Sequence, residues 1–289
     1  MSIEEYLHCV YVDFRREIEN GYNLCNLKNL SFESGNLPEY EHVQTQRLYL
    51  LRYAYAYAFE YADMYERVLK QLDDPKKISV VSFGCGTMLD YWSLVYAIKE
   101  QREIPCRIDY RGIDKIQWHY QFISRRKDNM HFELENITNF FDDENALDSD
   151  VYFFPKSISE FSDGEMETIL DGFKTKNIRK KVFYVCVSLR KKNETFDEKR
   201  THDIIKAIKK NGYIARPEPQ EYEEHGVKWY DLNFTYPTEA LSYLQHLNEK
   251  CPQFICKGKN CHYDCVYLNR QPILKTNFLY NYIIRFERI

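Results

Sequence analysis

The sequence has no uninterrupted apolar run near the roughly 20 residues that a helix needs to cross a bilayer. Its first residues, Met1-Ser2-Ile3-Glu4-Glu5, lack the positive and apolar segments of a secretory signal. Internal repeats and low-complexity segments are also missing. We therefore expect a soluble, cytoplasmic protein, in which the nine cysteines stay reduced and need not form disulfides. With 44% hydrophobic and 29% charged residues over 289 positions, one main core with additions is expected.

Charge of one sign is not in large excess either, because the formal net charge is only −4. The chain as a whole therefore has no general attraction to nucleic acid. The charge is nevertheless uneven: residues 1–75 are acidic, whereas ten basic and three acidic residues lie between Lys174 and Arg200. This run indicates either a local basic face or only the solvated face of a helix and a loop.

Residues 1–75 are predicted to form an N-terminal helical cap. Ser2 and Glu5 make a capping-box pattern, and helical apolar spacing continues until Gly21. A longer helix is predicted from Gln44 to Leu72, with a tyrosine at every fourth position from residue 49 to residue 65. This stripe is interpreted as packing against the main domain, as an aromatic wall over a substrate pocket, or as a protein-binding surface on helix 45–71.

After residue 77, short apolar runs typical of strands alternate with helical stretches, which predicts a mostly parallel sheet covered by helices. The expected strands are 78–83, 108–113, 130–134, 151–154 and 182–187. The expected helices between them are 90–100, 116–126, 163–174 and 201–211. A strand at 228–234, a helix at 238–247 and a closing strand at 278–285 are expected to follow.

A glycine-bearing turn, Gly84-Cys85-Gly86, follows the first expected strand and precedes a helix. Glycines let a backbone approach a ligand closely, and the helix start offers unpaired N–H groups. Asp114, just past the second strand, is placed to accept hydrogen bonds from ribose hydroxyls. A nicotinamide dinucleotide fits less well, because Leu89 stands at the third glycine position and Asp114 lies 28 residues beyond Gly86 instead of about 20.

The run from Ser82 to Gly86, together with Asp114, resembles motifs I and II of the class I S-adenosylmethionine (SAM)-dependent methyltransferases. The segment Glu135-Asn136-Ile137 resembles the family's adenine-side segment, and residues 150–160 resemble its fourth strand and substrate-facing loop. Ser82 stands where the family commonly has an acidic residue, and Met88 where it has a later glycine. The cofactor contacts that this resemblance implies are Gly84, Cys85, Gly86, Asp114, Asn136 and Ile137.

The resemblance covers residues 76–289 and implies a three-layer α/β Rossmann-like sheet whose final antiparallel pair comes from 228–234 and 278–285. The ligand crevice of such a sheet lies at the carboxyl ends of its strands. We therefore expect Lys156, Ser157 and Glu160 to be catalytic or orienting residues. Alternatively, Ser157 or Ser159 caps the next helix, which Glu160 supports. The basic run 190–192 is a candidate contact for a phosphate or carboxylate of the substrate.

Four cysteines gather in an expected insertion, residues 248–270, before the closing strand. In a reduced compartment this density indicates a metal site, most simply a structural zinc. The pairs Cys-Pro and Cys-His also resemble the cysteine segment of ribosomal small-subunit methyltransferase-like proteins, so an iron–sulfur cluster is an alternative, as is a loop without metal. The expected metal ligands are Cys251, Cys256, Cys261 and Cys265.

The sequence therefore predicts SAM-dependent methyl transfer to an unidentified acceptor. RNA is slightly favoured, because of the basic run, the aromatic helix and the cysteine segment. A small molecule or a protein side chain is the alternative acceptor. A catalytically silent SAM-fold subunit that binds a partner protein is a further alternative, since one fold hosts many functions.

Overall fold

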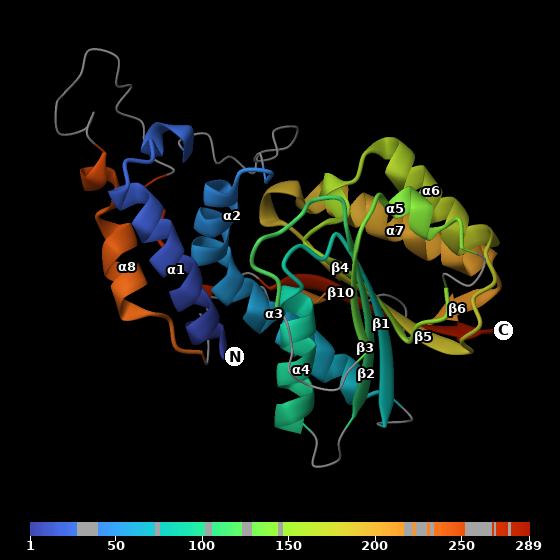
Figure 1. Cartoon of the computed structure of the whole chain (residues 1–289). Coiled ribbons are helices and arrows are strands. Elements are labelled where there is room, and N and C mark those ends of the chain that lie inside the picture. Colours follow the sequence, from blue (N-terminus) through green and yellow to red (C-terminus); the bar gives the residue numbers. More distant parts are fainter. Residues whose placement is uncertain are drawn as a thin grey trace. The chain divides into compact units, whose positions relative to one another are not determined.

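The computed structural model describes residues 1–27, 40–72, 76–101, 106–122, 129–143, 147–216, 222–223, 230–231, 234–251, 268, 270–276 and 279–289 (Figure 1). The chain divides into two compact units. The first unit contains Met1–Phe59, Trp118–Tyr120 and Lys228–Thr276. The second contains Glu60–Gln117, Gln121–Val227 and Asn277–Ile289. Compactness does not establish a separable domain, so the predicted boundary between residues 75 and 76 stays a prediction.

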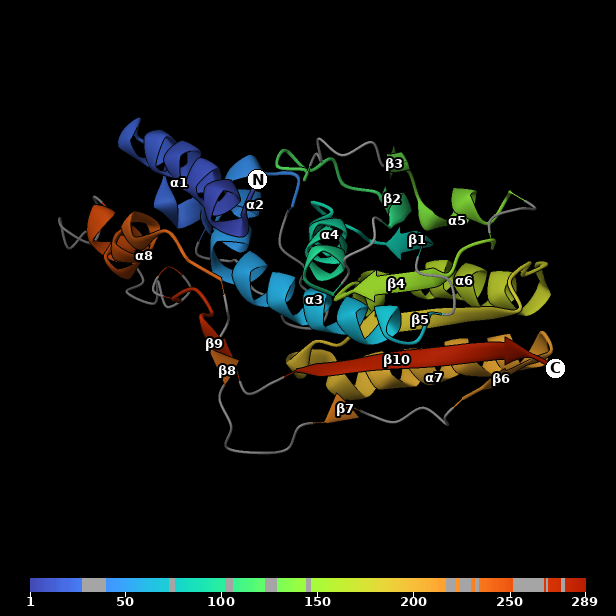
Figure 2. The ribbon, with the colours of Figure 1, turned by 90° about the horizontal axis from the view of Figure 1, so that it is seen from below.

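The second unit is built on one sheet with the strand order β3-β2-β1-β4-β5-β10-β6. Its parallel strands are β1 (Lys77–Phe83), β2 (Arg107–Asp114), β3 (Asn129–Leu134), β4 (Val151–Pro155) and β5 (Val182–Ser188). Strand β10 (Tyr280–Arg288) runs antiparallel to β5, and its arrow in Figure 2 points opposite to that of β4. The short strands β6 (Tyr213–Ala215) and β7 (Tyr222–Glu223) pair with β10.

Helices cover both faces of this sheet (Figure 1). One face carries α4 (Leu89–Gln101) and residues 60–69 of α3 (Tyr55–Leu69). The other carries α5 (Ile137–Phe140), α6 (Asp163–Thr175) and α7 (Glu194–Lys210), with 3-10 turns η3 (Ile158–Glu160) and η4 (Lys191–Asn193). The chain therefore has the three-layer class I methyltransferase fold, as predicted.

The alternation of side chains along β4 explains the three layers. Tyr152 and Phe154 join the core beneath α6, where Phe173 meets the Tyr152 ring at 5.3 Å between centroids. Phe153 points to the opposite face and stacks on Tyr65 of α3 at 4.9 Å. A strand that is buried on both faces is continuously apolar, which is why residues 151–154 were recognisable in the sequence.

Two sequence predictions in this unit are wrong. The closing strand pairs with β6, not with 228–234. Of that segment the structure describes residues 230, 231 and 234, and β8 (Tyr230–Asp231) pairs with β9 (Lys275–Thr276) in the first unit. Residues 116–122 form no helix. The reason lies in tertiary contacts within the first unit, where Trp118 packs on Tyr40 at 5.2 Å and the His119 amide donates to Gln46 Oε1 at 3.0 Å.

The first unit contains α1 (Ile3–Glu19), η1 (Leu24–Leu27), α2 (Val43–Tyr49), α8 (Thr238–Gln245) and η5 (Leu247–Lys250). The predicted capping box is confirmed: Ser2 Oγ accepts from the Glu5 amide at 3.1 Å, and Glu5 Oε2 accepts from the Ser2 amide at 2.8 Å. Gly21, at φ +93°, follows the end of α1 as expected. Helices α1 and α8 lie side by side in Figures 1 and 2, with an edge contact between Tyr11 and Tyr243.

The predicted tyrosine-rich helix is present, but it contains a π-helical turn, η2 (Leu50–Ala54), between α2 and α3. Tyr49, Tyr53 and Tyr57 contact one another in the first unit, with centroid distances of 5.4 and 5.8 Å along the row. Tyr61 and Tyr65 instead pack on the sheet of the second unit. Over part of its length, at Tyr61 and Tyr65, the tyrosine stripe therefore packs against the sheet. Among the described residues, no helix has the length and apolar content of a membrane span.

Candidate functional site

The glycine-bearing turn lies at the carboxyl end of β1, directly beside the end of β2. The amides of Gly84 and Cys85 both donate to the carbonyl oxygen of Ile113, at 2.8 and 3.1 Å. Gly84 and Gly86 have positive φ angles of +69° and +57°, which explains why glycine stands at both positions. A Cβ added to Gly84 would lie 2.6 Å from Ser157 Cβ, so the turn has no room for a side chain there.

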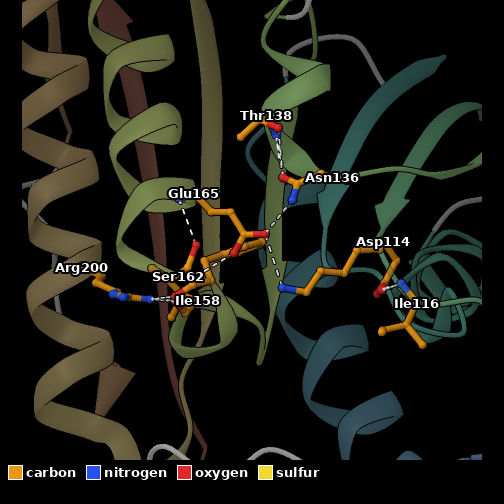
Figure 3. A network of polar contacts seen from close by, with 10 residues as sticks. Asp114, Ile116, Asn136, Thr138, Ile158, Ser162, Glu165 and Arg200 are labelled. Carbon is orange, nitrogen blue, oxygen red and sulfur yellow. Dashed lines mark hydrogen bonds and ion pairs between the residues drawn. The ribbon is translucent and has the colours of Figure 1, made fainter. Parts of the chain in front are cut away.

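Asp114 connects this turn to the turn after β2. Its Oδ2 accepts a hydrogen bond from the Gly86 amide at 2.8 Å. Its Oδ1 accepts one from the Ile116 amide, also at 2.8 Å (Figure 3). The carboxylate thus lies between two backbone segments at the crevice edge of the sheet. Three of the predicted cofactor residues, Gly84, Gly86 and Asp114, are brought together here.

The Cys85 side chain does not face this edge. It is buried, and a Cβ on Gly112 of β2 would lie only 2.8 Å from its sulfur. Burial raises the pKa of the Cys85 thiol well above its ordinary value, so the group stays protonated at neutral pH. Any contact of Cys85 with a cofactor therefore involves its backbone.

In the part of the chain that the structure describes, two residues other than glycine have left-handed backbones, and both follow strands at this edge. Met88, between β1 and α4, has φ +57°, and Lys156, directly after β4, has φ +56°. Such conformations cost on the order of 1 kcal/mol and persist only where surrounding contacts enforce them. Met88 is 1% exposed. It stands where the family that the sequence resembles has a glycine, and its left-handed backbone is a conformation that glycine adopts without strain.

A polar network ties the turns after β2 and β3 to the start of α6 (Figure 3). Asn136 caps α5 by accepting from the Thr138 amide at 3.0 Å, and its Nδ2 donates to Glu165 Oε1 at 3.1 Å. Lys115 Nζ lies 3.3 Å from the same oxygen. Burial acts to raise the pKa of Glu165, but hydrogen bonds from Ser162 and the charge of Lys115 outweigh it and lower the pKa.

The two predicted adenine-side residues differ in their surroundings. Asn136 belongs to this polar network, whereas the Ile137 side chain is 3% exposed and packs in the sheet core. The cofactor contacts of these two residues stay predictions.

The predicted catalytic residues lie together after β4, and each has an intramolecular partner. Lys156 Nζ forms a buried ion pair with Glu60 Oε2 at 2.7 Å and donates to the Leu189 carbonyl oxygen at 2.7 Å. Burial lowers the pKa of Lys156, and Glu60 opposes this shift. Ser157 Oγ donates to the Phe83 carbonyl oxygen at 2.6 Å, behind the glycine turn.

Glu160 forms an ion pair with Arg190, the first residue of the predicted basic contact 190–192. The next helix, α6, is capped by Ser162 with Glu165 in a capping box, so the alternative in which Ser157 or Ser159 caps it is wrong. Caps read from sequence are ambiguous where several serines precede a helix, as here at positions 157, 159 and 162. Catalytic roles for Lys156, Ser157 and Glu160 stay predictions.

A buried carboxylate behind the turn was not recognised from the sequence. Asp90, in the first turn of α4, is fully buried, and the Tyr110 hydroxyl donates to its two oxygens at 2.9 and 3.0 Å. The Tyr65 hydroxyl lies 3.4 Å from Asp90 Oδ2. Burial raises the pKa of Asp90 to about 6, although hydrogen bonds partly oppose the shift. The only sequence signal was its position just past the glycine turn, which is also an ordinary place for a helix-start aspartate.

The predicted metal site falls largely outside the described residues. Cys251 is described and buried, whereas Cys256, Cys261 and Cys265 lie in the part of the chain that the structure does not describe. Within the described residues, no group of three or more candidate ligands comes together. The zinc site, its iron–sulfur alternative and the insertion 248–270 therefore stay predictions.

No family model matches the sequence, and no curated protein matches it. Several solved structures are similar in fold. The plantazolicin methyltransferase BpumL, solved in complex with SAH, is 10% identical, with 96% of this chain and 100% of that chain covered and a TM-score of 0.40. The cyclopropane synthase MmaA2 from Mycobacterium tuberculosis is 12% identical, covering 77% and 82%, with a TM-score of 0.42.

A third structure is the Burkholderia thailandensis 1,6-didemethyltoxoflavin-N1-methyltransferase, solved with 1,6-didemethyltoxoflavin and S-adenosylhomocysteine. It is 7% identical, covering 79% of this chain and 78% of that chain, with a TM-score of 0.39. These values are low, and the class of the fold rests on the strand order described above.

The tight fit at Gly84 leads to a stability prediction. Gly84→Ala should lower the free energy of unfolding by about 2 kcal/mol or more, because left-handed strain adds to overlap with Ser157. Gly212→Ala is the matched control, since Gly212 has φ +83° with open space around it and should lose only about 1 kcal/mol. Urea unfolding measures both. Equal losses would contradict the packing at Gly84.

Asp90 should make stability depend on pH. Its pKa of about 6 in the folded protein lies above the ordinary 3.8, so the folded state binds the proton more tightly than the unfolded state. The free energy of unfolding should therefore fall as pH rises from about 4 to about 6, by on the order of 2–3 kcal/mol. Asp90→Asn should remove this decline. Urea unfolding across the same pH range tests it, and an unchanged pH slope in the variant would refute the assignment.

Proposed function

We propose that the second unit binds SAM at the carboxyl ends of β1 and β2 and transfers its methyl group to an acceptor. The observation that carries this proposal is the Asp114 carboxylate held beside the glycine turn, at 2.8 Å from the Gly86 nitrogen. In an open parallel sheet this edge is where ligands bind. The absence of a side chain at Gly86 allows a ligand to approach the backbone there.

The residues at this edge fit a nucleoside group. The two carboxylate oxygens of Asp114 accept hydrogen bonds from the Gly86 and Ile116 amides. A carboxylate is also the acceptor chemistry that ribose hydroxyls need. Asn136 supports the adenine side of the site by fixing the start of α5. Bound SAM would supply a methyl group on a positively charged sulfur. In-line attack of the acceptor on that methyl carbon would break the carbon–sulfur bond and release the sulfur as a neutral thioether.

The chain's own task is then to align the acceptor, and a dedicated base is not obligatory. We assign this task to the segment containing Lys156, Ser157 and Glu160. The contacts of Lys156 with Glu60 and of Glu160 with Arg190 support an orienting role, because they fix the loop after β4. The Lys156 ammonium is held by two acceptors, which does not favour it as a proton carrier.

Three acceptor classes stay open: RNA, a small molecule and a protein side chain. Arg190 and Arg200 are turned inward, since Arg190 pairs with Glu160 and Arg200 donates to the Phe161 carbonyl oxygen at 2.6 Å. The basic run therefore presents fewer charges to solvent than its sequence implies. Exposed lysines such as Lys174 and Lys199 still offer a surface for RNA phosphates. A small molecule or a protein side chain is the alternative.

A silent SAM-fold subunit is the second candidate function. It is favoured by the half-buried row of Tyr49, Tyr53 and Tyr57, which presents aromatic surface of the kind enriched at protein interfaces. Methyl transfer from labelled SAM to extracted RNA, protein or metabolite pools distinguishes an enzyme from such a subunit.

The cofactor proposal is tested by calorimetry with SAM and with NAD. SAM should bind and NAD should not, and Asp114→Ala should weaken SAM binding by about 1–3 kcal/mol because charge-assisted hydrogen bonds are lost. Asp109→Ala is the control, since Asp109 lies near the other end of β2 and pairs with Lys77 at 3.4 Å. It should leave SAM affinity unchanged. Binding of NAD without SAM, or equal effects of the two variants, would overturn the proposal.

The RNA acceptor is tested by charge reversal at exposed lysines. If RNA binds this face, Lys174→Glu combined with Lys199→Glu should weaken RNA binding and reduce the slope of its salt dependence by about 2, since two phosphate contacts are lost. The control pair Lys70→Glu and Lys99→Glu makes the same change of charge at two other exposed lysines, one directly after α3 and one in α4. Titrations of RNA at several salt concentrations measure both. Identical behaviour of the two pairs would favour a small-molecule acceptor.

A further inference from the structure

The first unit contains a buried arginine that has no counter-ion among the described residues. Arg52 lies in the π-helical turn η2 and is only 1% exposed, which places it among the largest fully buried side chains. In the described part of the chain, its Nε and Nη2 atoms have no hydrogen-bond partner and no carboxylate pairs with it. The residues on either side in this turn, including Leu50, Leu51 and Ala54, are buried as well.

Such a group is costly to leave unpaired. Desolvating one ion costs several kcal/mol, and a guanidinium cannot avoid this by releasing its proton at neutral pH. Burial and, to a smaller extent, the nearby Arg270 lower the pKa of Arg52 to about 10, although Tyr53 and Tyr236 act in the opposite direction. Arg52 therefore remains charged at neutral pH, with a second cation nearby.

The backbone around Arg52 is held from two other segments of the first unit. The Tyr236 hydroxyl donates to the Leu51 carbonyl oxygen at 2.7 Å, and the Ile273 amide donates to the Arg52 carbonyl oxygen at 3.1 Å. The side chain is thus positioned by its backbone and its burial, and its Nε and Nη2 donors have no hydrogen-bond partner among the described residues. π-Helical turns within α-helices frequently coincide with functional sites.

We propose that Arg52 binds an oxyanion, either a carboxylate or a phosphate group of a small molecule, within the first unit. The two unpartnered atoms, Nε and Nη2, form one edge of the guanidinium, and their N–H groups point the same way. This edge matches two oxygens of a carboxylate or phosphate in a bidentate pair. Arg270 adds favourable charge nearby. The inference does not depend on SAM binding in the second unit.

The test uses the full chain and follows its thermal unfolding with added sodium phosphate or sodium acetate, at ionic strength held constant with sodium chloride. At least one of the two anions should raise the Tm in a saturable way, because an anion that binds the folded state stabilises it. Phosphate and acetate are separate arms, and the stronger response identifies the class of anion. No response to either anion would overturn the proposal.

Three variants show whether Arg52 is responsible. Arg52→Met should abolish the anion response and leave the anion-free protein at least as stable, since it removes an unpaired buried charge. Arg52→Lys keeps the charge without the fork and should lose about tenfold or more in anion affinity. Arg47→Met is the control, because Arg47 has protein partners in Tyr120 and Gln44, and it should keep the response.

Other outcomes count against the site. An unchanged anion response in Arg52→Met would place the anion elsewhere, and loss of stability in Arg52→Met without anion would show that the guanidinium has a structural role. If Arg52→Met does not fold, the Arg52→Lys comparison and a titration of the Arg52 Nε resonance with the same anions decide the matter. SAM calorimetry on Arg52→Met is independent of these results, so failure of either proposal leaves the other standing.

Discussion

The hydrogen bonds of the Asp114 carboxylate are the constraint on which the candidate site depends. Parallel strands bring the ends of β1 and β2 to one edge of the sheet, but topology alone does not fix the turns that follow them. The two oxygens of Asp114 do so by holding the amides of Gly86 and Ile116. A group proposed to recognise ribose is therefore oriented within the folded chain itself. This is the preorganisation that a binding site on rigid elements needs.

Two residues at the same edge of the sheet have unfavourable backbone conformations, which local contacts stabilise. Met88 is fixed in the left-handed region by burial, and Lys156 by its ion pair with Glu60 and its bond to the Leu189 carbonyl oxygen. The Ser188 hydroxyl also donates to Glu60, at 2.6 Å, so the ends of β4 and β5 share one buried acceptor. Strain of this kind persists where surroundings over-determine the backbone. Glu60 therefore stabilises the loop that we propose to face the acceptor.

Much of the fold was predictable from the sequence because its signals are local. Strands buried on both faces read as continuous apolar runs, so β1, β4 and β5 were located to within one residue. The Ser2 and Glu5 cap was recognisable for the same reason. The glycine turn and Asp114 were also found, since turn geometry and the end of β2 demand those residue types.

The errors arose where distant segments decide the structure. Residues 116–122 have helical spacing, but contacts of Trp118 and His119 with the first unit prevail over it. The edge beside β10 is taken by β6, three residues long, whose signal is weaker than that of 228–234. Asp90 was missed because its character comes from Tyr110 and Tyr65, which are remote in sequence.

Two of the buried cations, Lys156 and Arg52, show why pairing is more informative than burial. They are almost equally hidden, at 4% and 1% exposed. Lys156 meets a buried carboxylate and a carbonyl oxygen, so its charge is satisfied within the protein. Among the residues that the structure describes, Arg52 meets neither, and its two unpartnered nitrogens belong to the edge that recognises oxyanions. A charge that the chain satisfies itself supports structure, whereas a charge it leaves unsatisfied indicates a ligand from outside.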